Sequence, residues 1–333
     1  MRALVTGATG FIGRHLVQEL INRGHSVRGL VREQRRAEIL PKETNIHVGN
    51  LADPLSLNGI VDNIDFVFHL GAALSGPWEL HQEITVEGTR ELLQLSCAAS
   101  VSRFIHVSSV VVYDTNHLQN ADFVTEESNM EKPEPAIGPY ARGKIEAEQI
   151  VHEFEKERDL KTTIVRPGLV YGPEKIIFEH LGTRVLGRFV AIGDANSWLP
   201  FTSVTSVASA LIHIAESPKT AGKTYHVVDE VTTPRGDYLR LLGELQKLKY
   251  RVIYLPVGLV ALICTMLSKL RKLPGLAWLP DTSGKKIRAR ALSIGFDNKR
   301  LQEDTEWSPP ESLREELSRI LSLNGRDNGG YSI

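Results

Sequence analysis

A turn with three regularly spaced glycines, close to the start of the chain, constrains the fold more than any other feature. Residues 6–13 read Thr-Gly-Ala-Thr-Gly-Phe-Ile-Gly, directly after a short apolar run, and an amphipathic stretch follows as far as Asn22. In this strand–turn–helix context Gly7 permits the turn, Gly10 lets backbone N–H groups approach a pyrophosphate, and Gly13 lets helix and strand pack closely. The motif predicts a binding site for a nicotinamide dinucleotide.

Short apolar runs alternate with amphipathic stretches through the first 170 residues. Strands that alternate with helices form a parallel sheet covered on both faces. We therefore predict an α/β protein with a doubly wound parallel Rossmann sheet and a smaller, mostly helical C-terminal lobe. The expected strands lie at residues 3–5, 26–31, 45–48, 66–70, 103–107, 162–165 and 224–228.

The alternation breaks at residues 172–200 and 230–322, which are richer in helix-forming residues and proline. We assign these segments to a substrate-binding lobe that closes over the strand ends. Residues 1–171, with about 201–229, form the expected NAD(P)-binding Rossmann domain. The glycine-containing end, 324–333, is expected to be a disordered tail.

Composition excludes several classes of protein. Over 333 residues the chain is 42% apolar and 24% charged, as in ordinary globular proteins, and its formal net charge of −1 predicts no binding to nucleic acid. Cys97 and Cys264 lie far apart, which indicates a reducing, cytoplasmic compartment without disulfides. The histidines show no metal-ligand spacing, so we expect no metal. The first strand begins close to residue 1, and we expect no cleavable signal peptide.

The end of the second expected strand indicates which dinucleotide is bound. An NAD-binding chain usually carries Asp or Glu there, but this chain has Val31 followed by Arg32. A guanidinium binds a 2′-phosphate, so NADP(H) is preferred and NAD(H) is the alternative. A solvated basic loop, or presentation of Glu33 to the ribose by a rotated loop, remains open.

Two further strand-end loops fit the same cleft. In one of them a side-chain amide can meet the adenine edge, and in the other small residues permit close approach of the backbone. Taken singly, each is an ordinary strand-end loop. With the glycine turn, the expected cofactor contacts are Gly7, Thr9, Gly10, Phe11, Ile12, Gly13, Arg32, Asn50, Leu51, Leu70, Gly71, Ala72 and Ala73.

Tyr-x-x-x-Lys occurs twice, at Tyr140–Lys144 and Tyr171–Lys175. Side chains at i and i+4 share a face only within a helix. A helix is expected to begin one residue before Tyr140 and to include Lys144. Tyr171 is followed by Gly and Pro173, which break a helix. The first pair is therefore the catalytic candidate, and the second is a chance match.

The chemistry of the first pair follows from charge. A lysine ammonium beside the hydroxyl of Tyr140 should lower the phenol pKa from about 10 toward the working range. Such a tyrosine is a general acid for ketone reduction or a base for alcohol oxidation. Ser108 and Ser109 end the fifth strand, where a serine can hold a substrate oxygen. The structural alternatives are a surface Tyr–Lys pair and two turn-forming serines.

Together these motifs resemble the extended short-chain dehydrogenases/reductases, of the broad NAD(P)-dependent epimerase/dehydratase superfamily. The resemblance implies that Tyr140 is the catalytic acid/base, that Lys144 bridges to the nicotinamide ribose, and that Ser109, with Ser108 as second choice, is the partner of the substrate oxygen. It implies further cofactor contacts at Val107, Ser108, Tyr140, Lys144, Pro167 and Val170. The matching pieces are residues 6–13, 69–73, 108–113, 140–144, 166–173 and 296–309.

The chain also departs from the family. Where the family often has Asn in Asn-Val-x-Gly-Thr, this chain has Thr85, which puts any relay role of that Asn in doubt. The family's later Asp-rich segment is replaced at 201–207. Nucleotide-sugar enzymes of the superfamily place Asn where this chain has Leu169, and losing that amide favours an apolar substrate. The expected substrate contacts are Leu74, Ser109 and Leu169.

An apolar run at residues 255–267, followed by Lys269, Arg271 and Lys272, marks the C-terminal half. Thirteen residues are too few to span a bilayer, which takes about twenty. We favour a buried helix that lines an apolar pocket over peripheral membrane contact through 255–272. A buried helix and a helix in contact with a membrane are both compatible with an apolar substrate. Within the family, the chain resembles the 3β-hydroxysteroid dehydrogenase-like and dihydroflavonol reductase-like members most.

The sequence thus predicts an NADP(H)-dependent oxidoreductase that interconverts a secondary alcohol and a ketone or aldehyde on a steroid-like, aryl or alkyl substrate. The first alternative is a nucleotide-sugar epimerase or dehydratase with tightly bound NAD(P). The second is a non-catalytic dinucleotide-sensing regulator, which would have no need of the Ser–Tyr–Lys set. The resemblance also implies a homodimer through helices near 90–99 and 144–157.

Overall fold

The computed structural model describes residues 1–115, 117–120, 122–158, 160–176, 181–185, 188–229, 233–245, 252–271 and 293–324. Seven parallel strands form the central sheet, in the order β13-β7-β5-β4-β1-β2-β3. This order confirms the predicted Rossmann sheet and its seven strands. They are β1 (Arg2–Thr6), β2 (Ser26–Val31), β3 (Asn45–Val48), β4 (Phe66–His69), β5 (Arg103–Val107), β7 (Thr162–Pro167) and β13 (Lys223–Val227).

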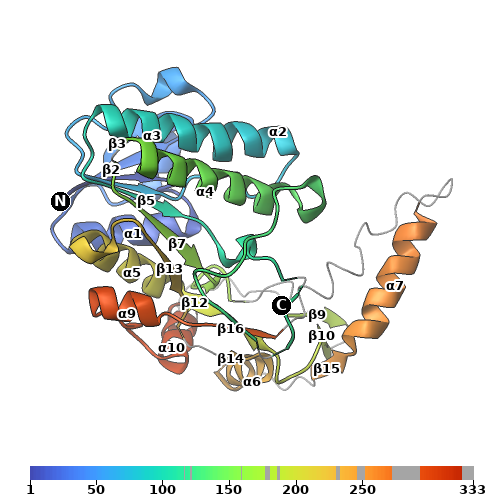
Figure 1. Cartoon of the computed structure of the whole chain (residues 1–333). Helices are drawn as coiled ribbons and strands as arrows, with labels where there is room; N and C mark the ends of the chain where they lie inside the picture. Colours follow the sequence, from blue (N-terminus) through green and yellow to red (C-terminus); the bar gives the residue numbers. More distant parts are fainter. Residues whose placement is uncertain are drawn as a thin grey trace.

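Helices cover both faces of this sheet, as Figure 1 shows. Side chains alternate along β1, so that Val5 joins one apolar core and Leu4 the other. The first core includes α1 (Phe11–Asn22) and α5 (Val204–Glu216). The second includes α3 (Gly88–Ala98) and α4 (Pro139–Arg158). The predicted helix over 11–22 is confirmed. The short helices between strands are η1 (Gln34–Ile39), η2 (Pro54–Leu57), α2 (Trp78–His81), the π-helix η3 (Gln82–Glu87), η4 (Val110–Val112), η5 (Pro135–Ile137) and η6 (Pro218–Thr220).

Strands as well as helices build the lobe beyond the sheet. The expectation of helix in 172–200 is wrong, because Phe189 and Ala191 are buried at a spacing of two, the period of a strand. The ring of Phe201 stacks on Tyr238 at 4.2 Å in the core of the lobe. Two short strands from the range expected for the Rossmann domain, β8 (Leu169–Tyr171) and β12 (Phe201–Ser203), contribute Tyr171 and Phe201 to this core. The other elements of the lobe are β9 (Thr183–Val185), β10 (Arg188–Ile192), β11 (Trp198–Leu199), β14 (Thr233–Pro234), β15 (Val252–Leu255), α6 (Arg235–Leu245), α7 (Val257–Leu270) and α10 (Leu313–Asn324).

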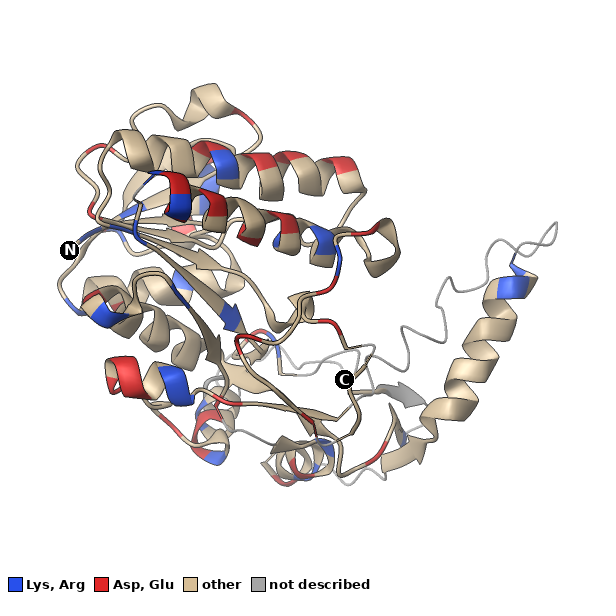
Figure 2. Ribbon diagram, in the orientation of Figure 1, with Lys and Arg blue, Asp and Glu red and all other residues tan. Residues whose placement is uncertain are grey.

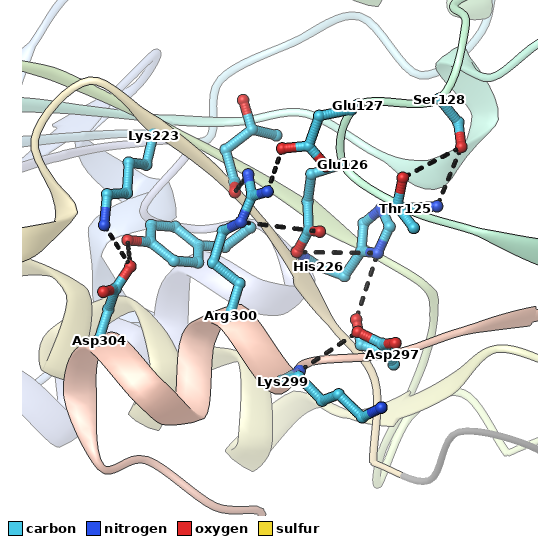
Figure 3. A network of polar contacts seen from close by, with 12 residues as sticks. Thr125, Glu126, Glu127, Ser128, Lys223, His226, Asp297, Lys299, Arg300 and Asp304 are labelled. Atoms are coloured by element: carbon cyan, nitrogen blue, oxygen red, sulfur yellow. Dashed lines mark hydrogen bonds and ion pairs between the residues drawn. The ribbon is translucent and has the colours of Figure 1, made fainter.

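Toward its C-terminal end the chain lies beside the Rossmann domain again. Strand β16 (Ile294–Phe296) pairs with β6 (Asp122–Val124) in a separate two-stranded sheet, and helix α9 (Lys299–Thr305) packs beside β13. Trp307 is buried in the same core as α1 and α5. Figure 3 shows α9 bound to the edge strand β13 by polar contacts. Arg300 is paired with Glu127, and Asp304 accepts from Lys223 Nζ at 2.7 Å. Part of 230–322 therefore packs on the Rossmann sheet. Of the expected tail, 324–333, Asn324 is the last residue of α10, and residues 325–333 lie outside the described residues.

Helix α7 lies at the edge of the molecule, away from the central sheet (Figure 1). Of its residues only Ala261 is buried. The favoured prediction that this run is buried is therefore wrong, because side chains such as Leu262 and Met266 are exposed and others, such as Val260 and Leu267, are only half-buried. Among the described residues, no helix has both the length and the apolar composition needed to cross a membrane.

Candidate active site

The glycine turn has the geometry of a phosphate cradle. Gly7 adopts a φ of +67°, and a Cβ on Gly13 would lie 2.1 Å from the carbonyl oxygen of Gly7. Gly10 is the N-cap of α1 and places no side chain on the first turn of the helix. The backbone N–H groups of that turn are therefore left for an anion, which a pyrophosphate supplies. These residues fit the dinucleotide expected from the sequence.

A buried polar network holds the loop after β4 against this turn. The Thr6 hydroxyl accepts from the backbone N–H of Gly71 at 3.0 Å and is 2.7 Å from His69 Nδ1. The other imidazole nitrogen lies 2.8 Å from the hydroxyl of Thr89 on α3. Burial lowers the pKa of His69 to about 3. The neutral imidazole therefore ties two strand ends to a helix without adding charge beside the cofactor site.

Thr85 takes part in the same arrangement. Its hydroxyl accepts from the backbone N–H of Ala73 at 3.0 Å, and its carbonyl accepts from the Thr89 hydroxyl at 2.5 Å. It lies in the π-helix η3, a wider turn of the kind often found at functional sites. Thr85, which stands where the family often has Asn, thus forms hydrogen bonds with residues close to it and holds the loop after β4, here called the cofactor loop.

The Ser–Tyr–Lys set comes together at the carboxyl end of β5. Tyr140 lies in the first turn of α4, close enough to the side chain of Ser109 for that hydroxyl to lower its pKa. One turn later Lys144 is buried and donates from Nζ to the carbonyl oxygen of Val107 at 2.8 Å. Tyr140 and Lys144 therefore share a helix face, as their spacing predicted.

The predicted pKa effect within this set is wrong. Burial raises the pKa of Tyr140, and the hydrogen bond from Ser109 opposes that shift only in part. Burial also lowers the pKa of Lys144, to about 8, against the opposing effect of the Glu148 carboxylate. The lysine ammonium is directed at a backbone carbonyl, and desolvation disfavours both charged forms. Tyr140 is therefore a neutral phenol at neutral pH.

The two adjacent serines have different surroundings. Ser109 lies at the N-terminus of η4, where its hydroxyl also accepts from the backbone N–H of Val111 at 3.3 Å. Ser108 is buried, its backbone N–H donates to Val165 at 2.7 Å, and its hydroxyl has no partner among the described residues. Of the two, Ser109 is the one that lowers the pKa of Tyr140. Which serine holds the substrate oxygen stays a prediction.

At the end of β2, Arg32 is exposed. Glu33 is bound by the Arg35 guanidinium at 2.6 Å and lies 3.6 Å from Arg36 Nε. These partners lower the pKa of Glu33. The carboxylate that competed with Arg32 for the ribose is therefore engaged by its own neighbours.

The other residues expected to contact the cofactor lie near the strand ends, and they differ in burial and in hydrogen bonding. Asn50 Oδ1 accepts from the N–H of Ala52 at 3.2 Å, so part of this amide holds its own loop. Leu51 is buried, and a Cβ on Gly71 would lie 2.5 Å from it, so these two loops touch. Most of the other expected contacts come from the segments just after β1 and β4, and the rest from the end of β7 and from β8. After β1 they are Thr9, Phe11 and Ile12, after β4 they are Leu70 and Ala72, Pro167 is the last residue of β7, and Val170 lies in β8.

The expected substrate residues other than Ser109 lie in different settings. Leu74 is 79% exposed just after the cofactor loop. Leu169 packs partly buried against the core of the lobe, and its backbone N–H donates to Pro200 at 2.6 Å. Among the described residues, neither side chain has a hydrogen bond or ring contact with Tyr140 or Ser109. Their role remains a prediction.

The second Tyr-x-x-x-Lys match does not share a helix face. Tyr171 lies in β8, is fully buried and donates from its hydroxyl to Asp229 at 3.0 Å. Burial raises the pKa of Asp229 to about 6. Tyr171 is thus a core residue that supports a buried carboxyl group.

Sequence reasoning assigned no role to the buried ion pair behind the site. Glu148, one turn beyond Lys144, binds Arg166 at 2.5 Å, and both side chains are almost completely buried. Arg166 also donates to the hydroxyl of Tyr113 at 2.7 Å. Glu148 stands four residues after Lys144, a spacing that could have indicated a shared face. His81, buried and edge-on to Tyr140 at 6.5 Å, was also missed.

Comparisons with known proteins agree with this geometry. The chain is 28% identical over 254 residues to cinnamoyl-CoA reductase 1 of Petunia hybrida, covering 72% of this chain and 76% of that protein. It is 29% identical over 263 residues to a ketoreductase of Stigmatella aurantiaca that acts on a farnesyl dihydroquinoline oxide, covering 77% and 76%. It is 28% identical over 244 residues to a 3-beta-hydroxysteroid dehydrogenase of Mycolicibacterium neoaurum, covering 68% and 65%. These names agree with the enzyme class expected from the sequence.

Solved structures share the fold. An Agrobacterium tumefaciens protein of the short-chain dehydrogenase/reductase superfamily, with bound NAD, aligns with a TM-score of 0.75 at 20% identity, covering 98% of each chain. The UDP-glucose 4-epimerase of Thermotoga maritima aligns with a TM-score of 0.75 at 21% identity, covering 98% of this chain and 99% of the other. The model of the NAD dependent epimerase/dehydratase family matches residues 3–228. The chain therefore belongs to the NAD dependent epimerase/dehydratase family, as its resemblance to the extended short-chain dehydrogenases/reductases predicted.

Proposed function

We propose that the protein is an NADP(H)-dependent oxidoreductase that interconverts a secondary alcohol and a ketone or aldehyde on an apolar substrate. The observation that supports this most is the meeting of Ser109, Tyr140 and Lys144 at the carboxyl end of β5, where the Ser109 side chain acts on the pKa of Tyr140. It joins a donor for a substrate oxygen to a tyrosine that can exchange a proton with that oxygen.

In this proposal each side chain has one task. The bound nicotinamide supplies the hydride for carbonyl reduction. Ser109 holds the carbonyl oxygen, and Tyr140 donates the proton that this oxygen needs as it becomes a hydroxyl. Lys144, one turn after the tyrosine, donates to the carbonyl oxygen of Val107 and so fixes the end of β5. Since burial raises the pKa of Tyr140, the phenol is protonated at neutral pH and holds the proton that carbonyl reduction needs.

The preference for NADP(H) rests on Arg32. Its exposed guanidinium follows β2, at the place where the ribose of a bound dinucleotide is recognised. The neighbouring Glu33 is bound by Arg35 and is poorly placed to accept from a ribose hydroxyl. A charged partner for a 2′-phosphate is thus present, and a free carboxylate for a bare ribose is not supplied by Glu33.

The apolar substrate is proposed from Leu169 and from the relatives. Leu169 packs among the apolar side chains of the lobe and supplies no polar anchor for a nucleotide diphosphate. The relatives' names include reductases of a cinnamoyl thioester and a farnesylated ring, and a steroid dehydrogenase. Their names share redox chemistry at a carbonyl or alcohol carbon next to an apolar group, which is a cinnamoyl, farnesyl-bearing or steroid part of the molecule. We expect the same class here.

Net NADPH consumption by the purified protein tests this proposal. The panel pairs 3-oxosteroids, aryl and alkyl ketones and aldehydes with UDP-, GDP- and dTDP-sugars, and NADH is the control cofactor. We expect consumption with apolar carbonyl compounds only, and faster with NADPH than with NADH. Conversion of a nucleotide sugar without net consumption would contradict the proposal and indicate a redox-neutral epimerase or dehydratase. Cofactor binding without turnover of any compound would indicate a sensor.

We also propose a homodimer through the outer faces of α3 and α4, which lie side by side on one face of the sheet (Figure 1). Light scattering on the eluted protein tests it. Twice the chain mass is expected, and a strict monomer would contradict the pairing.

A further inference from the structure

Helix α7 exposes an apolar stripe to solvent. The stripe consists of Leu259, Leu262, Ile263, Met266 and Leu270, whose exposed fractions are 52, 58, 46, 56 and 42%. Their spacing of three and four residues places them along one side of the helix. A helix that is apolar on nearly every side is ordinarily buried or in contact with lipid, and α7 is not buried.

The charge on and just after the helix is of one sign, positive. Lys269 is exposed in its last turn, and Arg271 and Lys272 follow in the sequence. From residue 252 to residue 280 the sequence contains no Asp or Glu. Figure 2 shows the same pattern, with α7 free of acidic residues and a basic end, while α3 and α4 carry both signs. Because the whole chain has a net charge of −1, this end of the molecule is a local exception.

The apolar stripe and the positive C-terminal end of α7 together indicate what kind of surface binds there. A surface that covers α7 must be apolar along the stripe and negative at its C-terminal end. An anionic bilayer has both properties, since acyl chains take up the stripe and headgroups pair with the lysine. A second copy of α7 offers the same apolar stripe but brings the same positive charge.

The length of α7 fixes how it contacts the bilayer. Its 14 residues span about 21 Å at about 1.5 Å per residue, less than the hydrocarbon core. The helix therefore lies along the interface and does not cross it. We propose that α7 docks the protein on the surface of membranes that contain anionic lipids. This inference does not depend on the proposed reaction.

Vesicle flotation of the full chain tests the proposal. Vesicles of phosphatidylcholine alone are compared with vesicles that also contain phosphatidylglycerol, at low and high salt. We expect binding to the anionic vesicles, weakened by salt. The double variant Leu262→Glu with Met266→Glu should bind at least about tenfold more weakly, because two side chains of the stripe become charged. Lys269→Gln should weaken binding about fivefold.

Leu55→Glu is the matched control. Leu55 is 79% exposed in η2, outside α7, so the same change of charge there should leave vesicle binding unchanged. Circular dichroism confirms that each variant is folded. Equal binding by wild type and the double variant would overturn the proposal, as would the absence of binding to any vesicle. A lipid-free dimer that the double variant dissolves would assign the stripe to a second copy instead.

Discussion

The carboxyl edge of the sheet and helix α7 are built in opposite ways. At the sheet edge, polar side chains are buried and joined to partners, as with His69 between Thr6 and Thr89 and Lys144 on Val107. On α7, apolar side chains such as Leu262 and Met266 are exposed and have no cover. Both invert the usual partition of residues between interior and surface.

This difference shows which interactions stabilise each region. Burying a polar group costs free energy unless it is hydrogen-bonded, so the sheet edge is ordered by its own internal contacts. An exposed apolar stripe lowers its free energy only when something covers it. Most polar groups of the sheet edge are thus satisfied within the chain, with the Ser108 hydroxyl as an exception, whereas the exposed apolar side of α7 has no cover among the described residues.

The largest expected effect is the loss of turnover in Tyr140→Phe. Removing the hydroxyl takes away the proton donor, and we expect the rate of carbonyl reduction to fall by about 10² to 10⁴. Tyr171→Phe is the matched control, because Tyr171 belongs to the other Tyr-x-x-x-Lys pair and is a core residue. It should keep turnover within a few-fold. Similar rates for the two variants would show that the assignment of Tyr140 is wrong.

The buried ion pair tests whether the sheet edge is ordered from within. In Glu148→Ala the Arg166 charge stays buried without its carboxylate, so the free energy of unfolding should fall by about 3–5 kcal/mol. Denaturant unfolding followed by circular dichroism measures it. The control is Glu146→Ala, on the same helix but paired with the partly exposed Arg142, where a loss of at most about 1 kcal/mol is expected. Equal losses would contradict the distinction.

Cofactor choice gives the next effect. In Arg32→Ser the 2′-phosphate loses a charged donor, and the KM for NADPH should rise about 10- to 100-fold while that for NADH changes little. Arg35→Ser serves as control, since that guanidinium is bound to Glu33. Steady-state kinetics with both cofactors provide the measurement. A parallel rise in both KM values would indicate a structural role for Arg32.

The smallest effect is a pH dependence. Since burial lowers the pKa of Lys144 to about 8, the ammonium is present below that pH and is lost above it. If its charge supports the proton transfer, kcat/KM for reduction should be level below about pH 8 and fall toward tenfold per pH unit above it. A level profile through pH 9 would show that the charge is not needed.

The lowered pKa of Lys144 also makes the free energy of unfolding depend on pH. Below about pH 8 both folded and unfolded chains carry the proton on Lys144, so this group adds no pH dependence. Between about pH 8 and the ordinary value of 10.5 only the unfolded chain binds it, and the contribution of Lys144 to the unfolding free energy rises with pH. Comparison of wild type with Lys144→Met isolates that contribution.

Strand and helix order in the first half was predictable because local patterns are strong there. The glycine turn fixes the passage from β1 to α1, and each apolar run of the sheet was placed within a residue or two. The separation of Tyr140 from Tyr171 also followed from local rules, since Pro173 excludes a helix at the second match. Such rules depend on neighbours in sequence only.

Long-range contacts were beyond the sequence. The pKa expectation for Tyr140 failed because the depth of burial and the acceptor for Lys144, a carbonyl on β5, are set by tertiary packing. The strands in 172–200 pair with partners such as β15, more than fifty residues away. The exposure of α7 could not be read from its composition, which is that of a buried helix.

Isotope transfer from the cofactor tests the central claim most directly. The purified protein is incubated with NADPH carrying deuterium at the transferred C4 position and with the best carbonyl compound of the panel. The account predicts one deuterium on the carbinol carbon of the product for each NADP⁺ formed, and loss of that transfer in Tyr140→Phe but not in Tyr171→Phe. Product without deuterium, or conversion without NADP⁺, would contradict hydride transfer to a carbonyl at this site.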